Sequence, residues 1–254
     1  MMRVDLNADM GESFGDWRMG DDAALLDVVT SANVACGMHA GDWDVMAATM
    51  ARAVERGVGI GAHPGFPDLQ GFGRRRMAMD HGSLRHLVTY QVGAAMGVAR
   101  AVGGAVRHVK LHGAMANMAA ADEAMARAAY EGALAAHPDA VLLVIAGTAQ
   151  QRAAEGMGAA WAGEIFADRG YRADATLVPR GEPGAMIHDP DEAADRMVRF
   201  VRDGAVTALD GTRVPVAVDS ICLHGDGLTA LAIARAVRGA LEADGIAVRA
   251  MEGR

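Results

Sequence analysis

Four histidines, each followed within two residues by glycine, stand where short apolar runs of the sequence end. They are His39, His63, His112 and His224. Imidazole binds metal ions and moves protons near neutral pH, and glycine lets a ligand approach the backbone. In parallel α/β folds the carboxyl ends of all strands lie on one face, where the loops build the active site. The pattern therefore predicts that these four histidines converge at one functional face.

The run Asp5-Leu-Asn-Ala-Asp9 places three polar side chains two residues apart. Successive side chains of a strand point to opposite faces, so we expect Asp5, Asn7 and Asp9 to share one face that points into a barrel. Buried carboxylates are costly unless they are paired with cations, a metal ion or hydrogen-bond donors. Asp5, Asp9 and Glu12 therefore need partners. The candidate partners are Lys110, His39 and His63.

A carboxylate and two imidazoles with one open position make a hydrolytic metal site. One hypothesis is therefore a divalent metal ion held by Asp9, His39 and His63. A hydrogen-bonded network without a metal ion explains the same three residues. The sequence leaves both interpretations open.

Lys110 is the only lysine among 24 basic residues, and the others are arginine. A chain that uses arginine for its ordinary surface charge indicates a specific task for its lone ammonium group. Because Leu111 follows this lysine, the phosphate-binding pattern G-x-x-x-x-G-K-[ST] does not occur in the sequence. A P-loop is therefore excluded.

A second polar group follows later in the chain, at Glu164, Asp168 and Arg169. Two carboxylates bracket a short apolar stretch, and the adjacent arginine can hold a substrate carboxylate through two parallel hydrogen bonds. The alternative is a buried ion pair that closes the end of a strand.

Acidic residues outnumber basic ones by 32 to 24, which gives a formal net charge of −8. This charge disfavours binding to nucleic acid and to anionic lipid. The longest purely apolar run, Ala140 to Ala146, is too short to span a membrane, and charges near the N-terminus interrupt any signal-peptide core. We therefore expect a cytoplasmic protein.

Cys36 and Cys222 are too few for a disulfide framework and are expected to be free buried thiols.

The elements that must position these residues are short β-like runs separated by Ala-rich helical stretches, which predicts βαβ units and a parallel sheet. The expected strands are residues 3–8, 31–36, 58–62, 106–111, 141–146, 217–223 and 246–251. The expected helices are residues 43–56, 82–102, 122–136, 190–203 and 228–243. No linker or repeat interrupts residues 1–254, so we expect one domain. Residues 65–79 are the one long loop, a candidate cover for a substrate.

Several motifs resemble those of the LamB/YcsF lactam-utilisation family, which comprises the A subunits of bacterial 5-oxoprolinase. The first are Asp5-Leu-Asn-Ala-Asp-Met-Gly-Glu-Ser-Phe-Gly15, Asn33-Val-Ala-Cys-Gly-Met-His-Ala-Gly-Asp42, Gly61-Ala-His-Pro-Gly-Phe-Pro-Asp-Leu69 and Gly71-Phe-Gly-Arg-Arg75. They continue with Val109-Lys-Leu-His-Gly-Ala114, Asn117, Glu164 to Tyr171, Leu177-Val-Pro-Arg180, Gly184-Ala185 and Ser220-Ile-Cys-Leu-His-Gly-Asp226. The resemblance spans nearly the whole chain.

The resemblance implies an irregular, TIM-like (β/α) barrel related to the glycoside hydrolase/deacetylase superfamily. It also implies ATP-dependent hydrolysis of 5-oxo-L-proline to L-glutamate, carried out together with subunits B and C. Since this chain lacks a P-loop, we expect ATP to be bound largely by those partners.

Within that frame we expect Asp9 or Glu12 to act as general base for water and Lys110 with His112 to stabilise the oxyanion. Arg74 or Arg169 is expected to hold the substrate carboxylate. The full set of expected substrate-binding residues is Asn7, Arg74, Arg75, Asn117, Glu164, Asp168, Arg169, His224 and Asp226.

The chain departs from the family pattern at a few positions. Leu111 stands where the family usually has proline, Met115 and Ala116 replace a Leu-Tyr pair, and Gly227-Leu-Thr229 replaces Thr-Pro-Gly. Loss of the tyrosine removes an aromatic wall and a hydroxyl group, so the lactam that is accepted is left open.

Two other functions remain open: a stand-alone metal-dependent amidase or deacetylase, and a substrate-binding subunit without catalytic activity. The sequence does not decide whether the chain forms a homo-oligomer.

Overall fold

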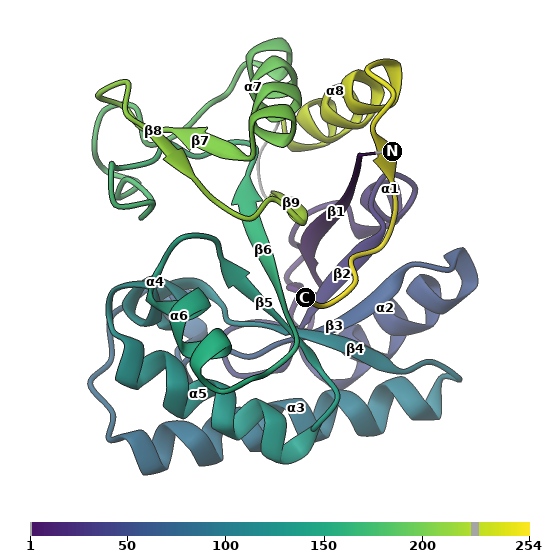
Figure 1. Ribbon diagram of the computed structural model, residues 1–254. Helices are drawn as coiled ribbons and strands as arrows, with labels where there is room; N and C mark the ends of the chain where they lie inside the picture. Colours follow the sequence, from purple (N-terminus) through teal and green to yellow (C-terminus); the bar gives the residue numbers. More distant parts are fainter. Residues whose placement is uncertain (1, 225–228) are drawn as a thin grey trace.

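The computed structural model describes residues 2–224 and 229–254, in which seven parallel strands close into a barrel (Figure 1). The barrel strands are β1 (Arg3–Met10), β2 (Ser31–Ala35), β3 (Gly59–His63), β4 (Val106–Lys110), β5 (Val141–Ile145), β6 (Trp161–Phe166) and β9 (Ser220–Leu223). They follow one another in this order, and β9 pairs with β1 to complete the ring. The expected TIM-like (β/α) barrel is therefore confirmed.

Helices surround the barrel, with α3 and α5 side by side below it and α7 and α8 above it in Figure 1. The helices are α1 (Asp22–Leu26), α2 (Trp43–Arg56), α3 (His81–Ala101), α4 (Gly113–Ala121), α5 (Glu123–Ala136), α6 (Ala149–Gly156), α7 (Pro190–Asp203) and α8 (Ala230–Ala243), with the 3-10 turn η1 (Leu69–Gly71). Local signals set the ends of several helices. The Asp42 side chain accepts hydrogen bonds from the first turn of α2, and Gly57 ends that helix with a φ of 68°. None of the helices in the described ranges has the length and apolar character that crossing a bilayer requires.

Within residues 2–224 and 229–254, three short strands lie outside the barrel. β7 (Ala205–Thr207) and β8 (Arg213–Pro215) form an antiparallel pair, and β10 (Ala247–Val248) pairs with the start of β1. The sequence did not predict β6, β7 or β8. In β6 the apolar run is interrupted by Gly163 and by Glu164, whose charged side chain points into the barrel.

The predicted helices 43–56 and 190–203 have the bounds of α2 and α7. Helices α1, α4 and α6 were not predicted. Helix α4 begins directly after β4, and its N-cap, His112, makes no capping hydrogen bond with its side chain, so the sequence carries no start signal. The expectation of one long loop was wrong, because residues 167–189 between β6 and α7 form a second one.

The alternation predicted for β1 is confirmed by the contacts of its side chains. Leu6 and Ala8 are fully buried in the hydrophobic core, whereas Asp5 and Asn7 contact polar side chains of neighbouring strands. The barrel interior is therefore polar. A column of hydrogen-bonded groups leads through it to the carboxyl ends of the strands.

Candidate active site

The first layer of the column, nearest the amino ends of the strands, is built around Asp5. Its Oδ1 accepts hydrogen bonds of 2.7 Å from the hydroxyls of Thr30 and Ser31, and its Oδ2 accepts one from Ser220 on β9. Burial raises the pKa of Asp5, and these three hydroxyl donors partly offset the shift. Asp5 therefore joins β1 to β2 and β9 and has a structural task.

The next layer holds Asn7, Asn33 and His108. Asn33 Nδ2 donates to Asn7 Oδ1 at 2.7 Å and to Asp9 Oδ1 at 2.9 Å, while its own Oδ1 lies 2.7 Å from His108 Nε2. Burial, helped by the nearby charge of Lys110, lowers the pKa of His108 to about 3. His108 is therefore neutral at physiological pH, and its Nε2 donates to Asn33.

Lys110 lies above this layer, between carboxylates from two strands. Its Nζ is 2.9 Å from Asp9 Oδ1, 2.8 Å from Glu164 Oε1 and 3.1 Å from Cys222 Sγ. Burial would lower the pKa of Lys110, but Asp9, Cys222 and Glu164 outweigh it and raise the pKa well above its ordinary value. The lone lysine is thus a fixed positive charge with an exposed fraction of only 5 %.

The two carboxylates that flank Lys110 differ. Burial would raise the pKa of Asp9, yet His63 and Lys110 lower it well below the ordinary value, so Asp9 is ionised. Burial raises the pKa of Glu164, although Lys110 opposes the shift. Asp9 is also the more accessible of the two, with 14 % of its side chain exposed against 1 % for Glu164.

A cluster of three histidines lies beside Asp9. His63 Nε2 is 3.0 Å from His112 Nδ1 and 3.3 Å from Asp9 Oδ2. The ring of His39 stacks on that of His112, with centroids 3.7 Å apart. Glu12 Oε1 lies 3.8 Å from His112 Nδ1 and 3.9 Å from His39 Nε2. We call Glu12, His39, His63 and His112 the histidine cluster.

Two glycines make room for these rings. A Cβ atom at Gly65 would lie 2.6 Å from His39 Nδ1, and one at Gly73 would lie 2.7 Å from His39 Cβ and 2.8 Å from His112 Cδ2. Burial lowers the pKa of His39 well below its ordinary value and that of His112 to about 3. Gly65, which follows His63 in the sequence, and Gly73, in the loop after β3, thus leave the space in which these imidazoles pack.

Across the mouth of the barrel, His224 pairs with Asp168. His224 Nδ1 lies 2.8 Å from both carboxylate oxygens of Asp168, and its Nε2 is 3.4 Å from a guanidinium nitrogen of Arg180. Burial would raise the pKa of Asp168, but His224 lowers it. Arg169 donates to the backbone carbonyl oxygens of Ala185 and Val178, so it holds the loop after β6 in place.

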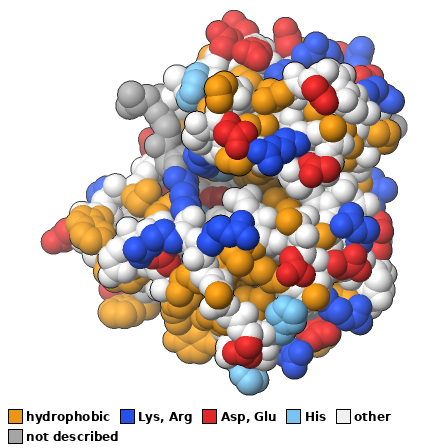
Figure 2. Space-filling model, turned by 90° about the vertical axis from the view of Figure 1, so that its left-hand side faces the viewer, with side chains coloured by type: hydrophobic (Ala, Val, Ile, Leu, Met, Phe, Trp, Pro, Cys, Tyr) orange, Lys and Arg blue, Asp and Glu red, His pale blue; other side chains and the backbone are white. Residues whose placement is uncertain are grey.

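These groups line a cavity of about 660 Å³ at the carboxyl ends of the strands. Figure 2 shows a hollow on this side of the molecule, with basic and acidic side chains around it. The predicted site residues on its wall are Asp9, Glu12, His63, Arg74, Lys110, His112, Asn117, Glu164, Arg169 and His224. Arg76, Arg172 and Arg180 add further positive charge. The cavity therefore combines a buried ammonium group with a basic wall.

Other predicted residues lie elsewhere. Asn7 is below the cavity in the barrel, and Asp168 lies behind His224. Arg75 forms an ion pair with Asp68 and is absent from the cavity wall. Asp226 lies outside the described residues.

The predicted metal set of Asp9, His39 and His63 shares its two histidines with a group of donor atoms that converge in the structure. The donor atoms that converge with those of His39 and His63 belong to Glu12 and His112. One carboxylate oxygen of Asp9 contacts this cluster through His63, and the other forms an ion pair with Lys110. Asp9 Oδ2 is 3.3 Å from His63 Nε2, but Asp9 does not belong to the group of four residues whose donor atoms all lie within 4.8 Å of one another.

Sequence reasoning missed Asn33, His108 and Cys222 as members of the polar column. A signal was present, since His108 and Lys110 are two residues apart on β4 and therefore share a face. The same alternation links Ser220 and Cys222 on β9. Both cysteines are free and buried, as expected.

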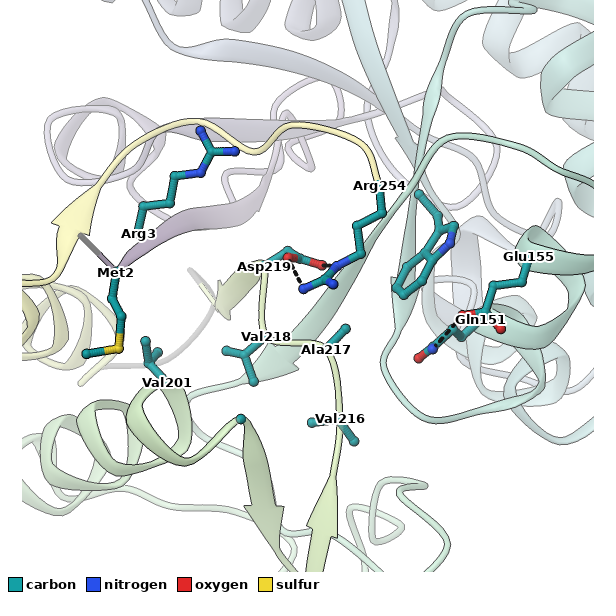
Figure 3. Close-up of a pocket in the computed structure, with 12 residues that line it drawn as sticks. Met2, Arg3, Gln151, Glu155, Val201, Val216, Ala217, Val218, Asp219 and Arg254 are labelled. Atoms are coloured by element: carbon teal, nitrogen blue, oxygen red, sulfur yellow. Dashed lines mark hydrogen bonds and ion pairs between the residues drawn. The ribbon is translucent and has the colours of Figure 1, made fainter.

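A second cavity, of about 580 Å³, lies near the start of β1 and the end of the chain (Figure 3). Its wall includes Val201, Val216 and Val218 together with an ion pair between Arg254 and Asp219. Both carboxylate oxygens of Asp219 accept hydrogen bonds from Arg254, and one also accepts from the backbone of Gly163. These contacts join the end of the chain to the segments before β9 and within β6.

The sequence of residues 4–254 matches the model of the LamB/YcsF family. The chain belongs to this family. It is 63% identical over 252 residues to the 5-oxoprolinase A subunit of Ruegeria pomeroyi, covering 99% of this chain and 100% of that relative. The family resemblance drawn from the motifs is therefore confirmed.

Solved structures agree with the fold. The lactam utilization protein of Thermus thermophilus superposes with a TM-score of 0.93 at 44% identity, covering 98% of this chain and 100% of the other. A family 4 carbohydrate esterase of Streptomyces lividans gives a TM-score of 0.51 at 9% identity, covering 97% of this chain and 91% of the other. The second likeness concerns the barrel alone and carries no information about substrate.

Proposed function

We propose that this chain is the A subunit of an ATP-dependent 5-oxoprolinase, and that it opens the lactam ring of 5-oxo-L-proline to give L-glutamate. The observation that carries this proposal is the buried Lys110 ammonium group beside the ionised Asp9 at a cavity wall rich in arginine. The full-length identity to a relative of that name supports it.

The substrate has one negative charge, on its carboxylate, and a planar amide in its ring. Arginine is suited to a carboxylate because its guanidinium group donates two parallel hydrogen bonds. Arg74 lies on this wall next to the histidine cluster and is the candidate that we propose, whereas Arg169 holds the loop after β6 through two backbone carbonyls. Binding the carboxylate at Arg74 leaves the amide free to approach Lys110.

Hydrolysis requires water to attack the amide carbon, the C–N bond to break and the ring nitrogen to gain a proton. Asp9 accepts the proton of the attacking water, and the Lys110 ammonium group stabilises the negative charge that develops on the oxygen atoms of the attacked carbon. Glu12 was an alternative base, but its carboxylate faces the histidines. His112 is less suited to the oxyanion than expected, because its Nε2 donates to the carbonyl oxygen of Phe72.

An unstrained amide is a poor electrophile, and ATP supplies the activation in this proposal, through phosphorylation of the amide oxygen. Water adds to the activated carbon, and the C–N bond breaks as the ring nitrogen gains a proton, which gives the γ-acyl phosphate of glutamate. A second water hydrolyses this acyl phosphate and releases phosphate and L-glutamate. The sequence contains no P-loop, so ATP is assigned to subunits B and C. The chain acts as one domain in the cytoplasm.

The test is release of glutamate from 5-oxoproline by this chain, with and without subunits B and C and with and without ATP. Asp9→Asn and Lys110→Met are compared with the wild type, and Arg100→Gln, on the exposed surface of α3, is the matched control. We expect turnover only with partners and ATP. Both site variants should abolish it and the control should retain it.

Two outcomes would redirect the assignment. Turnover of an amide or an acetylated sugar by the chain alone would support a stand-alone metal-dependent amidase or deacetylase, which the histidine cluster favours. Binding of 5-oxoproline with full turnover by the complex of Asp9→Asn would support a substrate-binding subunit without catalytic activity.

A further inference from the structure

His63 and His112 face each other through one ring nitrogen of each. His63 Nδ1 lies 2.9 Å from the carbonyl oxygen of Lys110, and His112 Nε2 lies 2.8 Å from that of Phe72. A carbonyl oxygen only accepts hydrogen bonds, so these two nitrogens carry the protons. In the neutral rings the other nitrogens, His63 Nε2 and His112 Nδ1, carry lone pairs. These two atoms are 3.0 Å apart.

Two lone pairs that face each other at this distance repel, unless a cation lies near both. His39 adds a third imidazole, and neither of its ring nitrogens has a hydrogen-bond partner among the described residues, although the ring is completely buried. An unsatisfied buried polar group of this kind is costly. One donor atom from each member of the histidine cluster lies within 4.8 Å of the donor atoms of the other three.

We propose that Glu12, His39, His63 and His112 bind a divalent transition-metal ion of the zinc type. Three imidazoles and a carboxylate are ligands that such an ion prefers. Ligands at about 2.1 Å from one ion are separated by about 3.0 to 3.4 Å, depending on the coordination geometry. The pair of His63 and His112 has this spacing, and Glu12 needs to approach by a few tenths of an ångström.

The surroundings resemble the outer shell of a metal site. Metal-binding histidines usually donate their second ring nitrogen to a carbonyl or carboxylate, which fixes the ring and its tautomer. The carbonyl oxygens of Lys110 and Phe72 do this for His63 and His112. An ion held here lies next to Asp9, since Asp9 Oδ2 is 3.3 Å from His63 Nε2.

A second group of donor atoms, from Asp9, Cys222 and His224, is a weaker candidate. Asp9 and Cys222 both contact the Lys110 ammonium group, and His224 is paired with Asp168. A cation there would compete with an existing positive charge. The two groups also differ chemically, because the second includes a thiol.

The experiment is titration of the metal-free, chelator-treated full chain with Co²⁺ and Zn²⁺, followed by calorimetry and visible absorption. We expect one equivalent to bind, with a Co²⁺ spectrum that lacks the intense thiolate band in the near ultraviolet. His63→Gln and His112→Gln should weaken binding by at least about 100-fold, the upper end of what loss of a supporting hydrogen bond costs. Cys222→Ser and His86→Gln, the latter on the exposed surface of α3, are controls that should bind normally.

X-ray absorption of the Zn²⁺-loaded wild type gives a test that does not depend on the folding of variants. Three imidazoles and no sulfur are expected around the ion. Absence of stoichiometric binding, or a sulfur ligand, would overturn the proposal and leave a shared proton between His63 and His112 as the explanation of their contact. Because binding is measured without substrate, this result is independent of lactam hydrolysis.

Discussion

Gly61 on β3 faces the imidazole of His108 on β4 so closely that a Cβ atom at position 61 would lie 2.1 Å from His108 Nε2. The contact fixes His108 where it can donate to Asn33, which in turn donates to Asp9. The lack of a side chain at Gly61 therefore helps to orient Asp9, the candidate general base.

Gly61→Ala should destabilise the fold and disturb the polar column, because His108 has no free space to enter. Overpacking of a close-packed interior typically costs about 1–3 kcal/mol. Urea unfolding measures the change in the free energy of unfolding. Gly93→Ala, on α3 with nothing within 4 Å of the added Cβ, is the matched control and should be neutral or stabilising. Equal stability of the two variants would contradict the packing argument.

Lys110→Met should lower stability as well as abolish turnover, because it leaves Asp9 and Glu164 without their shared cation. Removing one partner of a buried ion pair costs about 3–5 kcal/mol. The double variant Lys110→Met with Glu164→Gln removes one of the stranded charges and should recover part of that loss without recovering turnover. Denaturant unfolding and glutamate release separate the two effects. A fully stable single variant would show that Lys110 contributes little to folding.

Stability should fall as the pH drops below about 6.5, the ordinary pKa of histidine. His108 has a pKa of about 3 in the folded chain, so between these values the unfolded chain binds more protons. This group then contributes a loss of about 1.4 kcal/mol for each pH unit. Unfolding curves at pH 7, 6 and 5 measure the slope. The His108→Gln variant should show a shallower dependence, and an unchanged slope would argue against a neutral buried His108.

Arg74→Gln should raise KM for 5-oxoproline about tenfold with little effect on kcat, since a hydrogen bond to a charged group contributes about 1.5–3 kcal/mol. Arg75→Gln is the neighbouring comparison. Arg75 pairs with the buried Asp68, so its loss should lower stability and leave KM unchanged. Steady-state kinetics of the reconstituted complex give KM for 5-oxoproline in both variants and show which arginine binds the substrate. The reverse pattern would mean that Arg75 turns toward the substrate.

The sequence was sufficient for the barrel and for much of its polar interior. The alternation of Asp5, Asn7 and Asp9 was enough to orient β1, because period-two spacing holds wherever a strand forms. β6 was missed because of Glu164, the residue through which this strand contributes to the site. It carries Glu164 inward, and a buried charge inside a strand removes the apolar signal by which strands are recognised.

The pairing of side chains could not be predicted in the same way. The sequence grouped Asp9 with His39 and His63, whereas the donor atoms that converge with those of both histidines belong to Glu12 and His112. Strand order specifies which residues share a face and an end of the barrel. The loop conformation after β1, with Gly11 at a φ of 67°, then determines where Glu12 points, and no periodicity encodes that turn.

The closure of the barrel by β9 has a consequence for how the protein is made. Asp5 is synthesised at the start of the chain, but its hydroxyl partner Ser220 emerges 215 residues later. At about 5–20 residues per second, β1 waits at least about ten seconds for the strand that completes its surroundings. During that interval its carboxylates must stay in water, so we expect the nascent chain to remain open and to depend on chaperones until β9 has left the ribosome.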